Sequence, residues 1–384
     1  MDLAARRILA VLLLACGSLS APSRAEEKAP AQPAPAAAAA AAPARNPAPP
    51  AEAPPAYGKR RGVEKGSVRF QRDGDTGVAW RPQWSLPLQQ AASNGDVEAV
   101  QTLLAAGVDV NETSKQKLTA LHAAVHAGSL PVAVILLDAG ANADLADDLG
   151  MTPLHVAALD NRLDMVELLL KRGAAKSPKG QGDMTPLHIA AREGHIAVAL
   201  ALIDAGAEVN GRGFRSWEPL HFAVRTGDLT LVKKLLDKGA KIDAPRHNGW
   251  QALHLAVQIG NQPVCELLLA RGAKVNATTT NGLTPLHVAT QQNDPHIAEF
   301  LIARGAKVDM KAKTTGVTPL HIAAGLGKIE VARVLLAHGA SLTIVNDEGK
   351  TALDLSQRPV RNAERAQQLA AVHALLTEHA ASKR

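Results

Sequence analysis

The hydrophobic positions of this chain follow one pattern that recurs along most of its length. A leucine inside a Thr-Pro-Leu-His-like tetrapeptide returns every 33 residues, with a single interval of 34 before position 320. This leucine stands at positions 88, 121, 154, 187, 220, 253, 286, 320 and 353. A series of glycines keeps the same spacing at positions 107, 140, 173, 206, 239, 272, 305 and 339. Both series absorb the extra residue at the same point, so they mark one structural unit that repeats.

The residues of one unit predict two short helices. Thr152 is a good N-cap and Pro153 suits the first helical position, after which the apolar residues at 154, 157 and 158 share one helical face. The turn that follows uses residues that tolerate a left-handed backbone: Gly95, Gly128, Asn161, Gly194, Gly227, Gly260, Asn293 and Gly327. A second helix is predicted over Leu163–Lys171 and ends at Gly173. The polar stretch between units predicts a hairpin, which we call a finger.

A period of 33 residues with this tetrapeptide resembles the ankyrin repeat, over about residues 85–380. The resemblance implies an all-α solenoid of about nine units, each a helix–turn–helix with a hairpin finger. A single unit cannot bury its apolar face, so neighbouring units stabilise one another by stacking. The resemblance also implies binding of another protein through the fingers and the concave surface formed by the first helices.

The two ends of the repeat domain, residues 86–384, depart from the pattern as capping repeats should. The first unit reads Leu-Pro-Leu-Gln at 86–89, and the last reads Thr-Ala-Leu-Asp at 351–354, followed by extra residues that include Pro359. Residues 66–85 predict an N-terminal cap in which segments 68–70 and 78–80 flank a turn as a hairpin. We expect Trp80 and Trp84 to cover the open end of the first repeat.

Residues 1–25 have the features of a signal peptide. A basic start is followed by an apolar run over residues 8–15, which is too short to span a bilayer. Two processing sites compete: Ser-Arg-Ala at 23–25, and Leu-Leu-Ala-Cys at 13–16, which resembles a lipobox with Cys16 as the lipidated residue. A twin-arginine reading of Arg6 and Arg7 fits the flanking residues poorly. The chain is therefore expected in the periplasm or tethered to the outer membrane, with secretion as the alternative.

A linker with a basic collar is predicted over residues 26–65, and its charge affects which class of partner the net charge of the chain indicates. Residues 29–56 contain 15 alanines and nine prolines, a composition that favours a semi-rigid spacer. The formal charge of the chain is +6, but residues 74–384 carry only +1. A nearly neutral repeat domain argues against a nucleic-acid partner. The collar at 59–72 could instead touch anionic lipid near the tether.

No residue pattern indicates catalysis, a cofactor or a metal. The motif histidines lie on successive units about 10 Å apart, too far for one zinc ion, and in ankyrin repeats they bond the motif threonine and the neighbouring finger. They are His122, His155, His188, His221, His254, His287 and His321. Two cysteines exclude a disulfide scaffold, and Cys265 aligns with small apolar core residues. Phosphate-loop, hydrolase and metalloprotease motifs are absent from the sequence.

Where the units differ, the sequence predicts a protein-binding site. The residue before the motif threonine is expected to face the partner, and this column reads Leu118, Met151, Met184, Trp217, Trp250, Leu283, Val317 and Lys350. The predicted partner-binding residues are Met151, Met184, Arg212, Phe214, Arg215, Trp217, Arg246, His247, Trp250 and Leu283. Truncating either tryptophan is then expected to weaken binding with little loss of stability.

These observations favour a monomeric, non-enzymatic scaffold of a bacterial envelope that binds another protein. A secreted effector acting on host proteins is the alternative, and an enzyme with its site on the repeats is a remoter one. The N-terminal signal favours the envelope over the effector.

Overall fold

The computed structural model describes residue 80 and residues 82–382, and Pro82–Arg384 form one structural unit. The predicted signal peptide, Cys16, the linker with its collar and the capping hairpin except Trp80 lie outside the described residues. Within the described part of the chain, the α-helices fall into nine consecutive pairs, two short 3-10 helices lie in fingers at Gln181–Asp183 and Phe214–Ser216, and no strand occurs. The predicted all-α solenoid of about nine units is confirmed.

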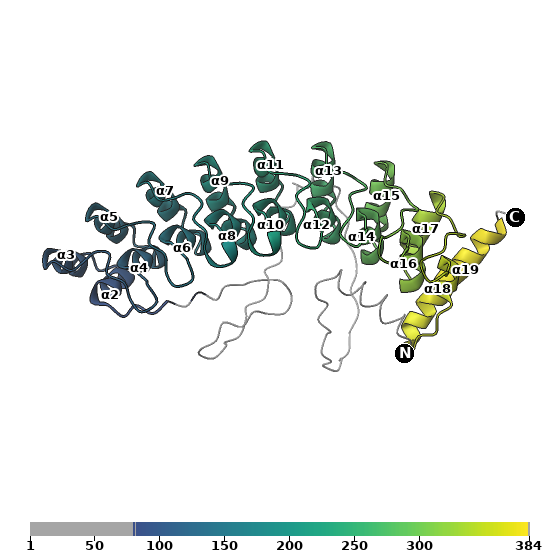
Figure 1. Cartoon of the computed structure of the whole chain (residues 1–384), viewed down its shortest axis with the longest axis horizontal. Helices are drawn as coiled ribbons and strands as arrows, with labels where there is room; N and C mark the ends of the chain where they lie inside the picture. The colour runs from purple at the N-terminus through teal and green to yellow at the C-terminus, as the bar shows by residue number, and fades with distance from the viewer. Residues whose placement is uncertain (1–79, 81, 383–384) are drawn as a thin grey trace, which may run out of the picture. The chain divides into compact units, whose positions relative to one another are not determined.

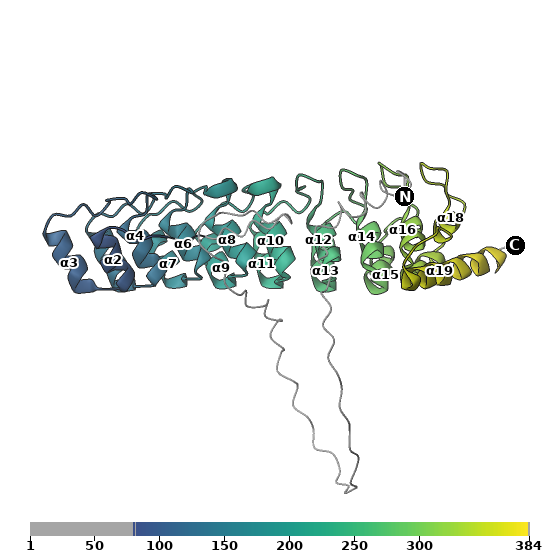
Figure 2. The same ribbon diagram turned by 90° about the horizontal axis from the view of Figure 1, so that it is seen from below.

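The helix pairs form two rows, with even-numbered helices in one and odd-numbered helices in the other (Figure 1). The pairs are α2 (Pro87–Asn94) with α3 (Val97–Ala105), α4 (Ala120–Ala127) with α5 (Leu130–Asp138), α6 (Pro153–Leu159) with α7 (Leu163–Lys171), α8 (Pro186–Glu193) with α9 (Ile196–Asp204), α10 (Pro219–Thr226) with α11 (Leu229–Asp237), α12 (Ala252–Gln258) with α13 (Gln262–Ala270), α14 (Pro285–Gln292) with α15 (Pro295–Ala303), α16 (Pro319–Leu326) with α17 (Ile329–Ala337), and α18 (Ala352–Ser356) with α19 (Ala363–Ser382). Even-numbered helices pack on one another and on their own partners. Figure 2 shows the fingers that join successive pairs on one side of both rows.

The motif histidine and the residue three positions before it, a threonine in most units, together begin the even-numbered helices from α4 to α16. In α4 the backbone N–H of Thr119 donates to Nδ1 of His122 over 3.2 Å, and the threonine hydroxyl lies 2.8 Å from the same nitrogen. Most of these helices end at a left-handed glycine or asparagine, such as Gly128 at φ 74° or Asn293 at φ 60°. The predicted caps and turns are confirmed, because they depend on residues three or four positions apart.

The same histidine ties each unit to the next finger. Because Nδ1 accepts a backbone N–H, Nε2 carries the proton and donates it: His122 donates to the Met151 carbonyl over 3.0 Å, and His155 donates to the Met184 carbonyl over 3.0 Å. All seven motif histidines are buried. The predicted structural role of these histidines is confirmed, and the part of the chain that the structure describes contains no group of side chains able to hold a metal ion.

Adjacent fingers are joined edge to edge by hydrogen bonds between backbones. The N–H of Thr280 donates to the carbonyl of Asn248 over 3.2 Å, and the N–H of Lys313 donates to that of Asn281 over 2.9 Å. This approach is so close that a Cβ atom on Gly282, which has φ 79°, would clash with the backbone of Lys313. Glycine is therefore required here by both conformation and space.

The first and last units differ in the residues that pack at their open ends. In the first unit Gln89 replaces the motif histidine, and its amide still donates to the Leu118 carbonyl over 2.7 Å. Trp84, expected to cover this end, has its ring 6.0 Å from that of His126, so it also contacts the second repeat. At the other end the 20-residue α19 buries Leu369, Val372 and Leu376 against the last repeats.

Two further features concern single residues and membranes. Cys265 is fully buried, and burial raises the pKa of its thiol to about 12, in agreement with its predicted place in the core. Among helices in the described residues, none has the length and apolar character needed to cross a bilayer.

Candidate functional site

The column of residues before the motif threonine lies in the interior. Relative exposure is 2% for Met151, 4% for Met184, 8% for Trp217, 4% for Trp250 and 3% for Leu283. The expectation that these five side chains face a partner from the surface is wrong. The column is enclosed because these residues sit where a finger meets the motif histidine of the unit before it, as the bond from His122 to the Met151 carbonyl shows.

The other five predicted residues are at least partly exposed and come together on two adjacent fingers. Arg212, Phe214 and Arg215 lie in the finger before α10, and Arg246 and His247 lie in the finger before α12. The His247 N–H donates to the Arg215 carbonyl over 3.1 Å, which joins the two tips. The structure therefore groups this half of the predicted set.

A stack of aromatic and guanidinium groups lies directly beneath these tips. Phe222, from α10, stacks on Trp217 with ring centroids 4.6 Å apart and planes 22° apart. The Arg246 guanidinium lies 3.8 Å from the centroid of the Trp217 ring. Both groups cannot occupy one face of the indole at these distances, so the ring is held between them. Arg225 lies 5.6 Å from both ring centroids.

Trp217 is thus a platform that orients Arg246. A guanidinium above an indole face is attracted by the negative charge of the ring. Burial lowers the pKa of Arg246 to about 10, with the like charges of Arg225 and Arg215 adding to the shift. Its Nε atom is enclosed without a hydrogen-bond partner. We name Arg212, Arg215, Arg225, Arg246 and His247 the arginine surface.

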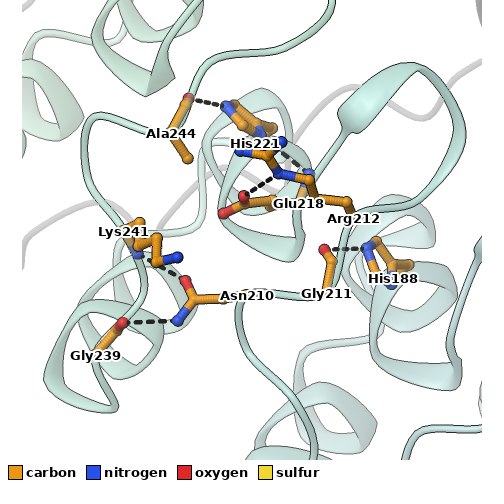
Figure 3. Close-up of polar contacts among 9 residues, drawn as sticks. All are labelled: His188, Asn210, Gly211, Arg212, Glu218, His221, Gly239, Lys241 and Ala244. Carbon is orange, nitrogen blue, oxygen red and sulfur yellow. Dashed lines mark hydrogen bonds and ion pairs between the residues drawn. The ribbon is translucent and has the colours of Figure 1, made fainter.

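A buried carboxylate stands beside this surface, at a position where most repeats have threonine. Glu218 is 1% exposed, and its Oε1 atom lies 3.5 Å from Nε of Arg212 (Figure 3). Burial raises the pKa of Glu218, and the charge of Arg212 offsets part of that shift. Arg212 remains largely exposed while its Nε atom pairs with this buried acid.

The fingers that carry tryptophan dock differently from the others. Elsewhere the motif histidine donates to the carbonyl of the residue before the next motif threonine, as His155 does to Met184. His188 instead donates to the Gly211 carbonyl over 2.9 Å, and His221 donates to the Ala244 carbonyl over 3.0 Å (Figure 3). Each acceptor lies six residues before a tryptophan. In these two fingers the histidine therefore bonds an earlier residue of the finger.

Two residues of the stack were not among the predicted site residues. Phe222 is the one aromatic residue in a column that otherwise holds Gln90, Ala123, Val156, Ile189, Leu255, Val288, Ile322 and Leu355. Arg225 shares its column with two other arginines, Arg192 and Arg358. Only Phe222 is therefore visible in the sequence as an exception to the repeat pattern, and the structure brings both residues to Trp217.

Comparisons with known families agree with this architecture. A family model described as ankyrin repeats in three copies matches residues 88–180, 220–312 and 293–383. A second model, described as ankyrin repeats in many copies, matches residues 187–236. The chain belongs to the ankyrin-repeat family, whose repeats generally act as protein–protein interaction modules and are typically non-enzymatic. A comparison with curated proteins gives no match.

Proposed function

We propose that this chain is an exported, non-enzymatic scaffold that binds another protein through the arginine surface of its central repeats. One observation carries the proposal: two neighbouring fingers, joined through His247 and Arg215, present cations above a buried aromatic stack. Arginine and aromatic residues dominate the energetics of protein interfaces. A side chain that is already oriented loses less conformational entropy on binding, and the Trp217 platform provides this for Arg246.

The proposed compartment is the bacterial envelope. It is supported by the basic start, the apolar run at 8–15 and the two candidate processing sites, which are features of exported chains. Processing at Cys16 would leave a lipid tether, and processing after Ala25 would leave a soluble periplasmic protein. A secreted effector is the alternative, since the same signal serves secretion.

Cell fractionation of the full chain and of Cys16→Ser tests this placement. If Cys16 is lipidated, the wild-type protein sediments with membranes and Cys16→Ser moves to the soluble periplasmic fraction. A mature protein whose intact mass begins at Glu26 would exclude the lipoprotein form while keeping export. Recovery of uncleaved protein beginning at Met1 from the cytosol would contradict export altogether.

Capture of a partner from envelope extract tests the binding surface. We expect the full-length wild-type chain to retain a partner that Arg215→Glu loses by at least tenfold, because the charge of an exposed contact residue is reversed. Lys233→Glu, an equal charge reversal on the exposed side of α11, is the matched control and should retain the partner. Equal capture by the two variants would place the partner elsewhere on the solenoid.

A further inference from the structure

The centre of the arginine surface brings the like charges of Arg246 and Arg215 close together. Arg246 faces Arg215 and Arg225, and these like charges both lower its pKa. Among the described residues, no carboxylate forms an ion pair with Arg246 or Arg215. The like charges of Arg246 and Arg215 repel one another, and this repulsion is relieved when an anion enters.

The acids nearest to this centre are engaged elsewhere. Glu218 pairs with Arg212, and Asp243, in the same finger as Arg246, lies 3.5 Å from the Lys274 ammonium of the next finger. Asp228 accepts the Leu231 N–H over 2.7 Å as the N-cap of α11. None of these carboxylates is directed at Arg246, so the neutralising anion has to come from outside this cluster.

The surrounding fingers extend the same charge preference. The finger sequences from 173 to 318 together carry a net charge of +5, with Lys176, Lys179, Lys241, Lys274, Lys307, Lys311 and Lys313 on either side of the arginines. The finger at 140–152 carries three aspartates and no basic residue. A negatively charged ligand is therefore favoured over the central and later fingers and disfavoured over the earlier one.

We propose that the arginine surface binds an acidic, extended segment of a protein partner, with a carboxylate seated between Arg246 and Arg215. This inference rests on the proposed function and names the chemistry of the partner. An arginine fork accepts a carboxylate through two parallel hydrogen bonds, and a partly desolvated guanidinium makes stronger ones than a fully hydrated one. The Nε atom of Arg246, enclosed and unpartnered, leaves the terminal nitrogens for the ligand.

The spacing of the fingers sets the spacing of the acids. Neighbouring repeats stack at roughly 10 Å, the distance between packed helices. A peptide in the extended polyproline II conformation advances about 3.1 Å per residue with three residues per turn, so every third side chain lies on the same face. Three residues of an extended segment therefore span one finger. Carboxylates at every third position meet successive fingers, whereas the same number of adjacent carboxylates would crowd onto one.

Fluorescence anisotropy with labelled peptides and the full-length protein tests this inference. The probe is a 12-residue peptide with Glu at every third position and Ser or Gly between. One comparison peptide has Gln at those positions, and another has the same number of Glu residues placed next to one another. We expect the spaced Glu peptide to bind at least tenfold more tightly than the Gln peptide, and more tightly than the clustered one. Its affinity should fall as salt is added.

Two variants and one competing ligand locate the binding. Arg215→Gln removes an exposed guanidinium without touching the stack and should weaken the spaced peptide about tenfold, the loss of one charge-assisted contact. Lys233→Gln on α11 should leave the affinity unchanged. Equal binding of the Glu and Gln peptides, no effect of Arg215→Gln, or tighter binding of a single-stranded oligonucleotide of the same charge would overturn the inference. If the peptide fails while Arg215→Glu still loses the captured partner, the binding surface stands and only the acidic segment is wrong.

Discussion

Lowering the pH from 7 to 5 is expected to unfold the repeat domain, through the motif histidines. Burial lowers the pKa of His155, His188, His221, His254 and His287 to about 4, and it lowers those of His122 and His321 as well. In the unfolded chain these groups titrate near 6.5. The Nδ1 atom of each already accepts a backbone N–H, so a proton cannot be added there without breaking the cap.

The sign follows from proton counting. Between about pH 6.5 and 4 the unfolded chain binds protons at these histidines and the folded chain does not, so stability is present above 6.5 and is lost as the pH falls. In this window each histidine lowers the free energy of unfolding by about 1.4 kcal/mol for each unit that the pH falls. Five such histidines together lower the free energy of unfolding by roughly 7 kcal/mol per pH unit, which is comparable with the whole stability of a typical domain.

The first repeat supplies the control for this prediction. Gln89 occupies the histidine position without a titrating group and bonds the next finger through its amide. His254→Gln should therefore keep the link to the Leu283 carbonyl and lower the pH slope of the unfolding free energy by about 1.4 kcal/mol per pH unit. Gln292→Ala, at an exposed position of α14 with no titrating group, should leave that slope unchanged. Urea titrations at pH 7, 6 and 5 measure it, and a stability that is flat across this range would refute the prediction.

Trp217→Ala is expected to destabilise the fold by about 3–5 kcal/mol, the usual cost of truncating a buried aromatic residue. This replaces the sequence-based expectation of a small stability loss, which assumed an exposed ring. Removing the indole leaves Phe222 without its stacked neighbour and Arg246 without its platform. Partner binding should weaken as well, because Arg246 is no longer oriented.

The central position of Trp217 in the solenoid predicts a second effect of this substitution, on the shape of the unfolding transition. In a repeat protein each unit is stabilised by its neighbours, so a weak central unit divides the array into two parts. We expect urea unfolding of Trp217→Ala, followed by circular dichroism, to broaden or split into two transitions. Trp217→Phe keeps an aromatic platform and should lose much less stability, while Leu220→Ala provides a reference core truncation of about 2–5 kcal/mol. A loss below about 1 kcal/mol for Trp217→Ala would mean that the ring is not part of the core.

Several predictions from the sequence are confirmed because they depend on neighbours along the chain. The N-caps at Thr119 and Thr152, the left-handed turns at Gly128 and Asn293, and the helix over Leu163–Lys171 are all set by residues three or four apart. Repetition strengthens such signals, because the same local sequence pattern occurs in many units. The predicted roles of the motif histidines and of Cys265 followed from comparing equivalent positions in different units.

The candidate site was only half predictable. Arg212, Phe214, Arg215, Arg246 and His247 have the expected partial or full exposure, because finger tips lie on the surface of any such solenoid. Met151, Met184, Trp217, Trp250 and Leu283 are buried, because the histidine of one unit holds the finger of the next against the helices. An apolar column is equally compatible with a binding face and with an interface between repeats, so its pattern could not decide between them.

The sequence by itself determined that this protein is a stack of helix pairs, which residues begin and end most of the first helices, and that its fingers vary most around the two tryptophans. The tertiary structure alone decided that Trp217 is a buried platform, that Phe222 lies against it, and that Arg246 is held over its ring. Trp217 and Arg246 belong to different fingers, and their contact depends on how closely neighbouring units stack. That distance is set by the volumes of side chains packed between repeats, which no local pattern along the chain records.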